Sequence, residues 1–400
     1  MRRFCAIAIL NLLAGPVLAQ DDLAALTRRA RELEDKGQTD AAVTVFAQAA
    51  RGPDSPAVGD ILDRYCSMLL RTGRYADAVP VAERLLKIRA TRAGGDGIQL
   101  AGARNQLALA YKLSGRVRDA IPLYEQTLKA FQGHKELAST PVTATVMHNL
   151  AAAYATAGRV ADAERLYLSG LEIAGRVPNG DKFIPQGHHN LATFYFSEGR
   201  NAEAADLFRK ALTAKEKELG PDDPNVAVTL NNLAGVLLSD GDATGAEKLL
   251  LRAVDIFKKS KFETHPHALI TKNMLAEVYR SQGRLPEAET LARETLKQLE
   301  TNLGSADNSR NAVELSACLV RLGYVLKDRV KNKDAEEMAR RAVALRERFL
   351  EPGHPDTIGA WSLLAGVLRA SGQLDEAEKL YRKAKTATDD RFGKAHPKSA

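Results

Sequence analysis

Hydrophobic residues recur along the chain with the period of amphipathic helices, most clearly between Leu219 and Ser260. Pro221 and Pro224 exclude helix before Asn225, because proline lacks an N–H donor and restricts the residue before it. Two apolar stripes with helical spacing follow, separated by Gly241. They are Val226, Leu230, Leu233, Ala234 and Leu237, then Ala246, Leu249, Leu250, Ala253, Val254 and Phe257. The pattern predicts a helix–turn–helix unit whose two apolar faces both need neighbours.

Copies of this unit supply the neighbours. Turn glycines recur at Gly37, Gly73, Gly115, Gly158, Gly199, Gly241 and Gly283, with successive spacings of 36, 42, 43, 41, 42 and 42 residues, and again at Gly372. An alanine follows each turn glycine by five residues, a large side chain precedes most of them by four, and a small one precedes them by seven. A fixed period with small residues at helix crossings predicts an all-α solenoid of about nine repeats.

The eighth repeat, about residues 309–350, breaks the glycine pattern. Its turn reads KDRVKNKDAE, without glycine, and is interpreted as two residues longer than the others. A longer loop is favoured over a functional hinge, and both remain open.

Several repeats have a small residue three positions before a large one, typically tyrosine, then the turn glycine, then an alanine, and finally an aromatic residue: Tyr124, Tyr167, Phe208 or Tyr381. This order resembles the tetratricopeptide repeat. The period of 42 and the segments LGPDDPNVAVTLNNLA and GHPDTIGAWSLLAG resemble the longer variety of kinesin light chains, here in an exported bacterial type. The resemblance covers roughly residues 21–397. It implies a right-handed superhelix that binds proteins, without naming the partner.

Residues 1–19 are typical of a cleaved signal peptide. Arg2 and Arg3 precede an apolar run at residues 4–13, and Val17-Leu18-Ala19 fits a cleavage site. The alternative, an uncleaved anchor, is disfavoured because the run is short for a bilayer. We therefore expect a periplasmic or secreted protein with one solenoid domain over 20–400 and no membrane insertion after cleavage.

Composition excludes several functions. The chain has 57 Lys and Arg against 50 Asp and Glu, a net charge of +7, but both signs are mixed and no basic cluster contains interleaved aromatic residues. Nucleic acid is therefore not an expected partner. Beyond the signal, only Cys66 and Cys318 could form a disulfide, and about six repeats separate them. Cys66 stands at a small crossing position, which favours a buried thiol.

Catalytic signatures are missing from the sequence. It has no HExxH, Walker A loop, CxxC or nucleophile elbow, so we expect a non-enzymatic protein without a cofactor. Zinc between His148, His188 and His189 is conceivable but disfavoured, because the repeat pattern brings no carboxylate or thiol nearby.

A polar ladder is the main candidate site. His148 and His189 lie ten residues before their turn glycines, where other repeats have Asn105, Asn231 and Asn273. Asn149, Asn190 and Asn232 lie beside them. An asparagine side chain offers both a donor and an acceptor, so such a ladder can pair with the backbone of an extended peptide. The matching asparagines of kinesin light chains imply this role. The alternative is that the amides bond to neighbouring helix ends.

Side chains three residues before the turns refine this groove. Ala155, Phe196 and Leu238 form an apolar strip, and Lys112 and Arg280 place a cation on either side of it. The first interpretation is a module that binds a peptide segment in a concave groove. If its amides face water in the free protein, replacing them should change stability little. If His148 or His189 accepts a ligand N–H, protonation near pH 6.5 or below should reduce affinity.

The rival interpretation is a structural scaffold that assembles through its C-terminal end. It rests on five apolar residues that no following helix would cover: Trp361, Leu364, Leu368, Leu374 and Leu380.

Overall fold

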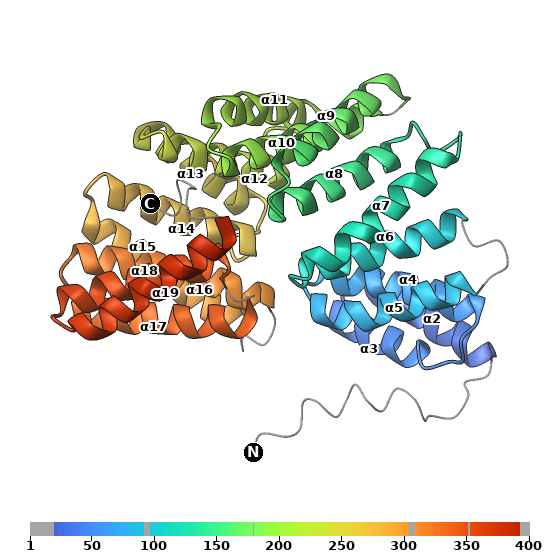
Figure 1. The fold of residues 1–400 in the computed structure, drawn as a ribbon, viewed down its shortest axis with the longest axis horizontal. Helices are drawn as coiled ribbons and strands as arrows, with labels where there is room; N and C mark the ends of the chain where they lie inside the picture. The colour runs from blue at the N-terminus through green and yellow to red at the C-terminus, as the bar shows by residue number, and fades with distance from the viewer. Residues whose placement is uncertain (1–19, 92–96, 179, 304–308, 351–352, 393–400) are drawn as a thin grey trace, which may run out of the picture. The chain divides into compact units, whose positions relative to one another are not determined.

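The computed structural model describes residues 20–91, 97–178, 180–303, 309–350 and 353–392, and every regular element in these ranges is helical (Figure 1). The chain divides into two compact units, Met1–Ala153 and Tyr154–Ala400, with the division inside α8. The predicted signal peptide lies outside the described residues. A single solenoid domain over 20–400 stays a prediction.

Eight of the nine predicted pairs lie within one unit and contact each other, from α2–α3 to α6–α7 in the first and from α10–α11 to α18–α19 in the second. The ninth, α8–α9, spans the division between the units and stays a prediction. The first unit contains α2 (Gln20–Asp35), α3 (Thr39–Ala49), α4 (Pro56–Arg71), α5 (Tyr75–Ala90), α6 (Ile98–Leu113), α7 (Val117–Gly133) and most of α8 (Pro141–Thr156). The second contains α9 (Val160–Arg176), η2 (Gly180–Lys182), α10 (Ile184–Ser197), α11 (Asn201–Leu219), α12 (Pro224–Ser239), α13 (Ala243–Lys259), α14 (Pro266–Ser281), α15 (Leu285–Leu303), α16 (Ser309–Asp328), α17 (Asn332–Phe349), α18 (Pro355–Ala370) and α19 (Leu374–Phe392).

The start and end of α12 follow from its sequence. Asp223 caps the helix, because its Oδ1 accepts the Asn225 N–H at 2.7 Å. Helix α12 begins at Pro224, one residue earlier than predicted, since a proline in the first turn has no N–H that needs a helical partner. The helix ends before Gly241, whose φ of 84° favours glycine over residues with a side chain.

Small residues let the two helices of each pair approach closely. The alanines seven residues before the turn are fully buried, as predicted: Ala108, Ala151, Ala192, Ala234, Ala276 and Ala365. So are the alanines five residues after it: Ala78, Ala120, Ala163, Ala204, Ala246 and Ala288. A larger side chain at either point would have to displace a neighbouring helix, because protein cores are close-packed.

The eighth repeat is regular at its turn, which corrects the sequence interpretation. Val330 takes the place of the turn glycine, with a φ of 60°. Its N–H donates to Lys327 O at 2.9 Å, and the next N–H donates to Leu326 O at 2.9 Å, as in the glycine turns. The turn therefore has no extra residues. The longer spacing between this turn and the previous one arises before the turn. The first helix of this repeat, α16, has 20 residues, whereas α14, the first helix of the preceding repeat, has 16.

Val330→Gly is expected to stabilise the protein by about 1 kcal/mol, because a β-branched residue is strained at positive φ. Little burial is lost, since Val330 is 78% exposed. Urea unfolding followed by circular dichroism measures the change. Gly283→Val is the reciprocal control, because a Cβ there would meet nothing within 4 Å, so only backbone strain is added. Unchanged stability in both variants would contradict the strain argument.

In two repeats of the second unit, an arginine directly after the turn ties the repeat to the preceding one. The Arg200 guanidinium lies 3.9 Å from the centre of the Tyr195 ring and 2.8 Å from Glu164 in the preceding repeat. Arg284 repeats this arrangement, 4.0 Å from the Tyr279 ring and 2.8 Å from Glu247. We call this arrangement the turn clamp. The tyrosines belong to the repeat pattern of the sequence, whereas the paired charges do not follow from it.

The C-terminal repeat covers most of its own apolar residues, which corrects the reason given for self-association. Trp361, Leu364 and Leu368 are buried. The Trp361 indole donates to Glu347 at 2.9 Å, and the Lys383 ammonium lies 4.2 Å from its ring centre. Helix α19 supplies the cover that the sequence analysis expected from a further repeat. Of the five residues, Leu374 is the one with a largely exposed side chain.

Candidate functional site

The two units divide the predicted site residues between them. The first unit holds Asn105, Lys112, His148 and Asn149, and the second holds His189, Asn190, Phe196, Asn231, Asn232, Leu238, Asn273 and Arg280. One continuous row from Asn105 to Asn273 stays a prediction. Within the second unit, the first helices of successive repeats contact each other, α10 with α12, α12 with α14, α14 with α16 and α16 with α18.

The ladder residues are more enclosed than predicted. Exposed fractions are 3% for His148, 9% for His189, 8% for Asn231 and 4% for Asn273, while Asn105 is half-buried. The expectation that the amides face open water is therefore wrong for Asn231 and Asn273. The accessible polar groups are the half-buried side chains one residue later, at Asn149, Asn190 and Asn232.

A hydrogen bond between successive first helices explains part of this burial. The Asn232 amide nitrogen on α12 lies 3.0 Å from His189 Nε2 on α10. In the first unit, Gln106 on α6 donates in the same register to Asp63 on α4 and to Ser67 Oγ at 3.1 Å. Asp63 is thus the ladder residue of the second repeat, which the sequence analysis missed although it lies ten residues before Gly73. In these two cases the side chain nine residues before a turn bonds to the ladder residue of the preceding repeat, which is buried at His189 and exposed at Asp63.

Two ladder amides in the second unit have no such partner. The Oδ1 atoms of Asn231 and Asn273 are buried, and neither has a hydrogen-bond partner among the described residues. Met274 occupies the covering position that would serve Asn231, and its thioether is a weak acceptor only. Buried polar groups are nearly always hydrogen-bonded in folded proteins, so these two amides retain unused bonding capacity.

His189 is held in its neutral form. An amide nitrogen can only donate, so Nε2 accepts from Asn232 and the ring proton is on Nδ1. Burial, followed by the nearby Lys215 ammonium, lowers the pKa of His189 from 6.5 to about 4. The predicted titration near pH 6.5 is therefore corrected to a much more acidic range. The Phe208 ring, 5.3 Å away between centres, encloses the imidazole further.

Two side chains of the predicted apolar strip are partly accessible. Phe196 on α10 and Leu238 on α12 are half-buried. Gly235 on α12 marks a close approach of side chains, because a Cβ there would lie 3.3 Å from Met274 Cε and 3.9 Å from Phe196 Cε1. We call the surface formed by Asn190, Phe196, Asn232, Gly235, Leu238, Met274, Arg280, Arg321 and Lys327 the first-helix face.

Charges on this face are distributed unevenly. Arg280, the predicted cation, forms ion pairs of 2.6 Å with both Glu277 and Asp328. By contrast, no hydrogen bond or ion pair within the described chain joins Arg321 or Lys327 on α16 to another residue. Arg321 is not among the predicted site residues, because its register becomes visible only when Val330 is seen to occupy the turn position nine residues later. In the first unit, burial lowers the pKa of Lys112.

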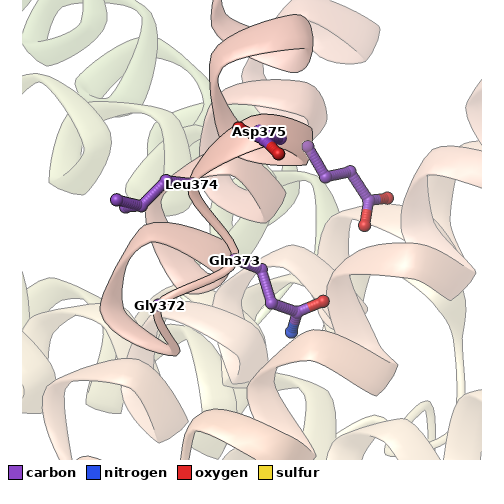
Figure 2. Close-up of a pocket in the computed structure, with 5 residues that line it drawn as sticks. Gly372, Gln373, Leu374 and Asp375 are labelled. Carbon is purple, nitrogen blue, oxygen red and sulfur yellow. The ribbon is translucent and has the colours of Figure 1, made fainter.

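The hollow at the turn between α18 and α19 is not a candidate site. It is lined by five consecutive residues, Gly372 to Glu376. Figure 2 shows the Gln373, Leu374 and Asp375 side chains pointing in different directions rather than toward a common point. Such an open depression offers a ligand no converging polar groups.

Neither metal nor thiol chemistry is indicated in the described ranges. They contain no group of three His, Cys, Asp or Glu side chains that could hold a metal ion. Cys66 and Cys318 are buried free thiols, and burial raises the pKa of each to about 12, which makes both unreactive. His265 and His354 cap α14 and α18 through their Nδ1 atoms, as expected for turn residues. None of the described helices combines the length and apolar character of a membrane span.

Comparison with solved structures supports this fold. Aspartyl phosphate phosphatase F from Bacillus subtilis is 13% identical, with 97% of this chain and 98% of that chain covered and a TM-score of 0.58. The apo quorum sensor NprR from B. thuringiensis is 17% identical, with coverages of 92% and 99% and a TM-score of 0.57. Repeats of a putative kinesin light chain from Podosopora anserina are 23% identical, with coverages of 51% and 95% and a TM-score of 0.40.

Comparison with families gives the assignment. No curated protein matches the chain. One model of the tetratricopeptide repeat matches residues 58–133, 183–259, 226–301 and 315–390, and a second model with the same description matches residues 105–178. These ranges coincide with the helix pairs described above. Because the first model alone matches more than half of the chain, the chain belongs to the tetratricopeptide repeat family.

Proposed function

We propose that the chain is a non-enzymatic interaction module that binds an extended polypeptide segment along the first-helix face of the second unit. Tetratricopeptide repeat proteins generally bind other proteins, and the repeat fold is generally non-catalytic. The observation that carries the proposal is the pair of Asn231 and Asn273, whose amide oxygens lack partners at the same register of successive first helices. A side-chain amide whose hydrogen bonds are unused can rotate to pair with a peptide N–H or C=O.

The spacing of the two amides suits an extended ligand. Packed helices lie about 8–10 Å apart, and an extended chain rises about 3.3 Å per residue. Amides on successive first helices can therefore engage backbone groups about three residues apart. Phe196 and Leu238 supply apolar contact beside them, which polar backbone pairing alone would not give.

The test uses peptides selected from a random 12-residue phage library on the immobilised chain. Asn231→Ala combined with Asn273→Ala should weaken the best selected peptide by at least about tenfold, which corresponds to about 1.4 kcal/mol. Calorimetric titration measures the affinity. Because neither amide oxygen has a partner in the free protein, melting curves should shift little.

A matched control replaces Asn201 and Asn332 with alanine. Both lie at the starts of second helices in the same unit, and their amides bond to neighbouring turns. This double variant should bind the peptide like the unmodified chain. Equal affinities for both double variants would sink the proposal. A large loss of melting temperature on changing Asn231 and Asn273 would show that the amides are structural instead.

We also propose that the protein is exported, on the pattern of residues 1–19. Cleavage after Ala19 would leave Gln20 as the first residue of the mature chain, in the periplasm or outside the cell.

A further inference from the structure

Two buried nitrogen donors lie among three helices of the second unit. Lys215 on α11 is 8% exposed, and His189 on α10 is 9% exposed. A lysine is almost never this enclosed in a folded protein unless its charge is paired. Within the described chain, however, no carboxylate forms an ion pair with the Lys215 ammonium. The described residues therefore leave this buried positive charge without a counterion.

Helix α12 brings the two donors together. The Lys215 ammonium donates to Thr229 Oγ1 at 3.1 Å, and the Asn232 amide on the same helix donates to the His189 ring at 3.0 Å. Thr229 and Asn232 are three residues apart, so they are neighbours on one face of α12, with Cβ atoms about 5–6 Å apart. On α11, Phe208 packs on His189 and lies about two helical turns before Lys215, on the same face. Both donors therefore lie where α10, α11 and α12 meet.

Most of the hydrogen-bonding capacity of these donors is unused. An ammonium carries three N–H groups, and Thr229 accepts from one of those of Lys215. The Thr229 hydroxyl itself donates to Asn225 O at 3.2 Å. Because His189 Nε2 accepts from the amide, its Nδ1 carries the ring proton, and this buried atom has no hydrogen-bond partner. Two ammonium N–H groups and one imidazole N–H group thus remain without an acceptor among the described residues.

The electrostatic surroundings of the two donors are positive. Burial lowers the pKa of Lys215, and the nearby Asp223 carboxylate only partly opposes this effect. Asp223 Oδ1 instead accepts from the backbone and side-chain nitrogens of Asn225, at 2.7 and 2.9 Å. Burial, followed by the Lys215 ammonium, lowers the pKa of His189. A negative charge placed between the two nitrogens would relieve both unfavourable effects.

We propose that Lys215 and His189 bind a small monovalent anion of the halide class, such as chloride, where α10, α11 and α12 meet. A halide brings negative charge and several lone pairs but no proton, which matches groups that can only donate. A water molecule would bring protons that need acceptors and would leave the ammonium charge uncompensated. The anion would join the fifth repeat to the sixth. This site is independent of the proposed peptide binding.

The experiment compares sodium chloride with sodium gluconate at equal ionic strength and near neutral pH. Equal ionic strength gives equal screening of surface charges, and gluconate is too large for an enclosed site of one ion. An anion that binds only the folded state raises the folded-to-unfolded ratio about elevenfold at a concentration of about ten times its Kd. The urea midpoint should therefore rise with chloride but not with gluconate. Chlorine NMR of the same samples should show line broadening by bound chloride.

Lys215→Met removes the charge and keeps an unbranched side chain. It should fold, because replacing an unpaired buried charge with an apolar group is not destabilising. This variant should lose both the chloride-specific shift of the midpoint and the line broadening. Lys210→Met is the matched control, since Lys210 lies on the same helix, is exposed and pairs with Asp206 at 2.7 Å. The control should respond to chloride like the unmodified chain.

A crystal soaked in bromide locates the ion. An anomalous peak between Lys215 Nζ and His189 Nδ1 would support the proposal. A peak at that place without anomalous signal would identify water and overturn it. Equal chloride responses of the unmodified chain and Lys215→Met, or no chlorine line broadening beyond that of Lys215→Met, would overturn it as well. Peptide selection is a separate measurement, so either proposal can fail while the other stands.

Discussion

Glu289→Ala is expected to destabilise the second unit by about 2 kcal/mol, a large effect for one surface-adjacent residue. Glu289 is only 6% exposed. Its carboxylate pairs with Arg293 at 2.8 Å on its own helix and with Arg329 and Lys331 of the next repeat. Burial raises the pKa of Glu289, but Lys331 and then Arg293 outweigh it and hold the pKa below its usual value. Removal of the carboxylate leaves three cations facing one another.

The last repeat provides a control in the same register. Glu378 lies six residues after its turn, as Glu289 does, but among the described residues its carboxylate forms an ion pair with the exposed Arg382 alone. Exposed pairs of this kind contribute little, so Glu378→Ala should change stability by less than about 0.5 kcal/mol. Urea unfolding followed by circular dichroism compares the two variants. Equal effects would mean that the ion pairs of Glu289 with Arg329 and Lys331 do not couple neighbouring repeats.

The fold was predictable because its signals are local. A turn that needs positive φ favours glycine, and a close helix crossing needs a small side chain, so both leave a mark at a fixed spacing. The exception is instructive: Val330 adopts the same turn at a cost in backbone strain, and a pattern based on glycine could not find it. The ion pair between Arg200 and Glu164 joins residues 36 positions apart, so no local pattern could reveal it.

The site was only partly predictable, because the burial and hydrogen bonding of each ladder residue depend on the side chain that packs over it. The register of Asn231 and Asn273 followed from repeat spacing alone. Their burial did not, because it depends on the side chain that the next first helix places over them. The same cause determines His189, which is enclosed by Asn232 from one side and Phe208 from another. Arg321 could be recognised only after Val330 was known to occupy the turn position and the Glu277 carboxylate was known to pair with Arg280.

The burial of His189 predicts a specific sensitivity to acid. Its pKa is about 4 in the folded protein and near 6.5 when unfolded. Between these values the unfolded state binds the additional proton, so stability falls as the pH falls from about 6.5 to about 4. The linkage limits this loss to about 3 kcal/mol, at 1.36 kcal/mol for each unit of pKa difference. Above pH 7 the residue contributes no pH dependence.

His189→Asn should remove this dependence while keeping the fold, because asparagine occupies the same register at Asn231 and Asn273. Urea unfolding at a series of pH values measures the difference in stability between the variant and the unmodified chain. That difference should favour the variant progressively as the pH falls below 6.5, and other titrating groups cancel in the comparison. His134→Asn is the control, since an exposed imidazole loses little hydration on folding. A difference that stays constant from pH 7 to pH 4 would show that His189 reaches water and titrates alike in both states.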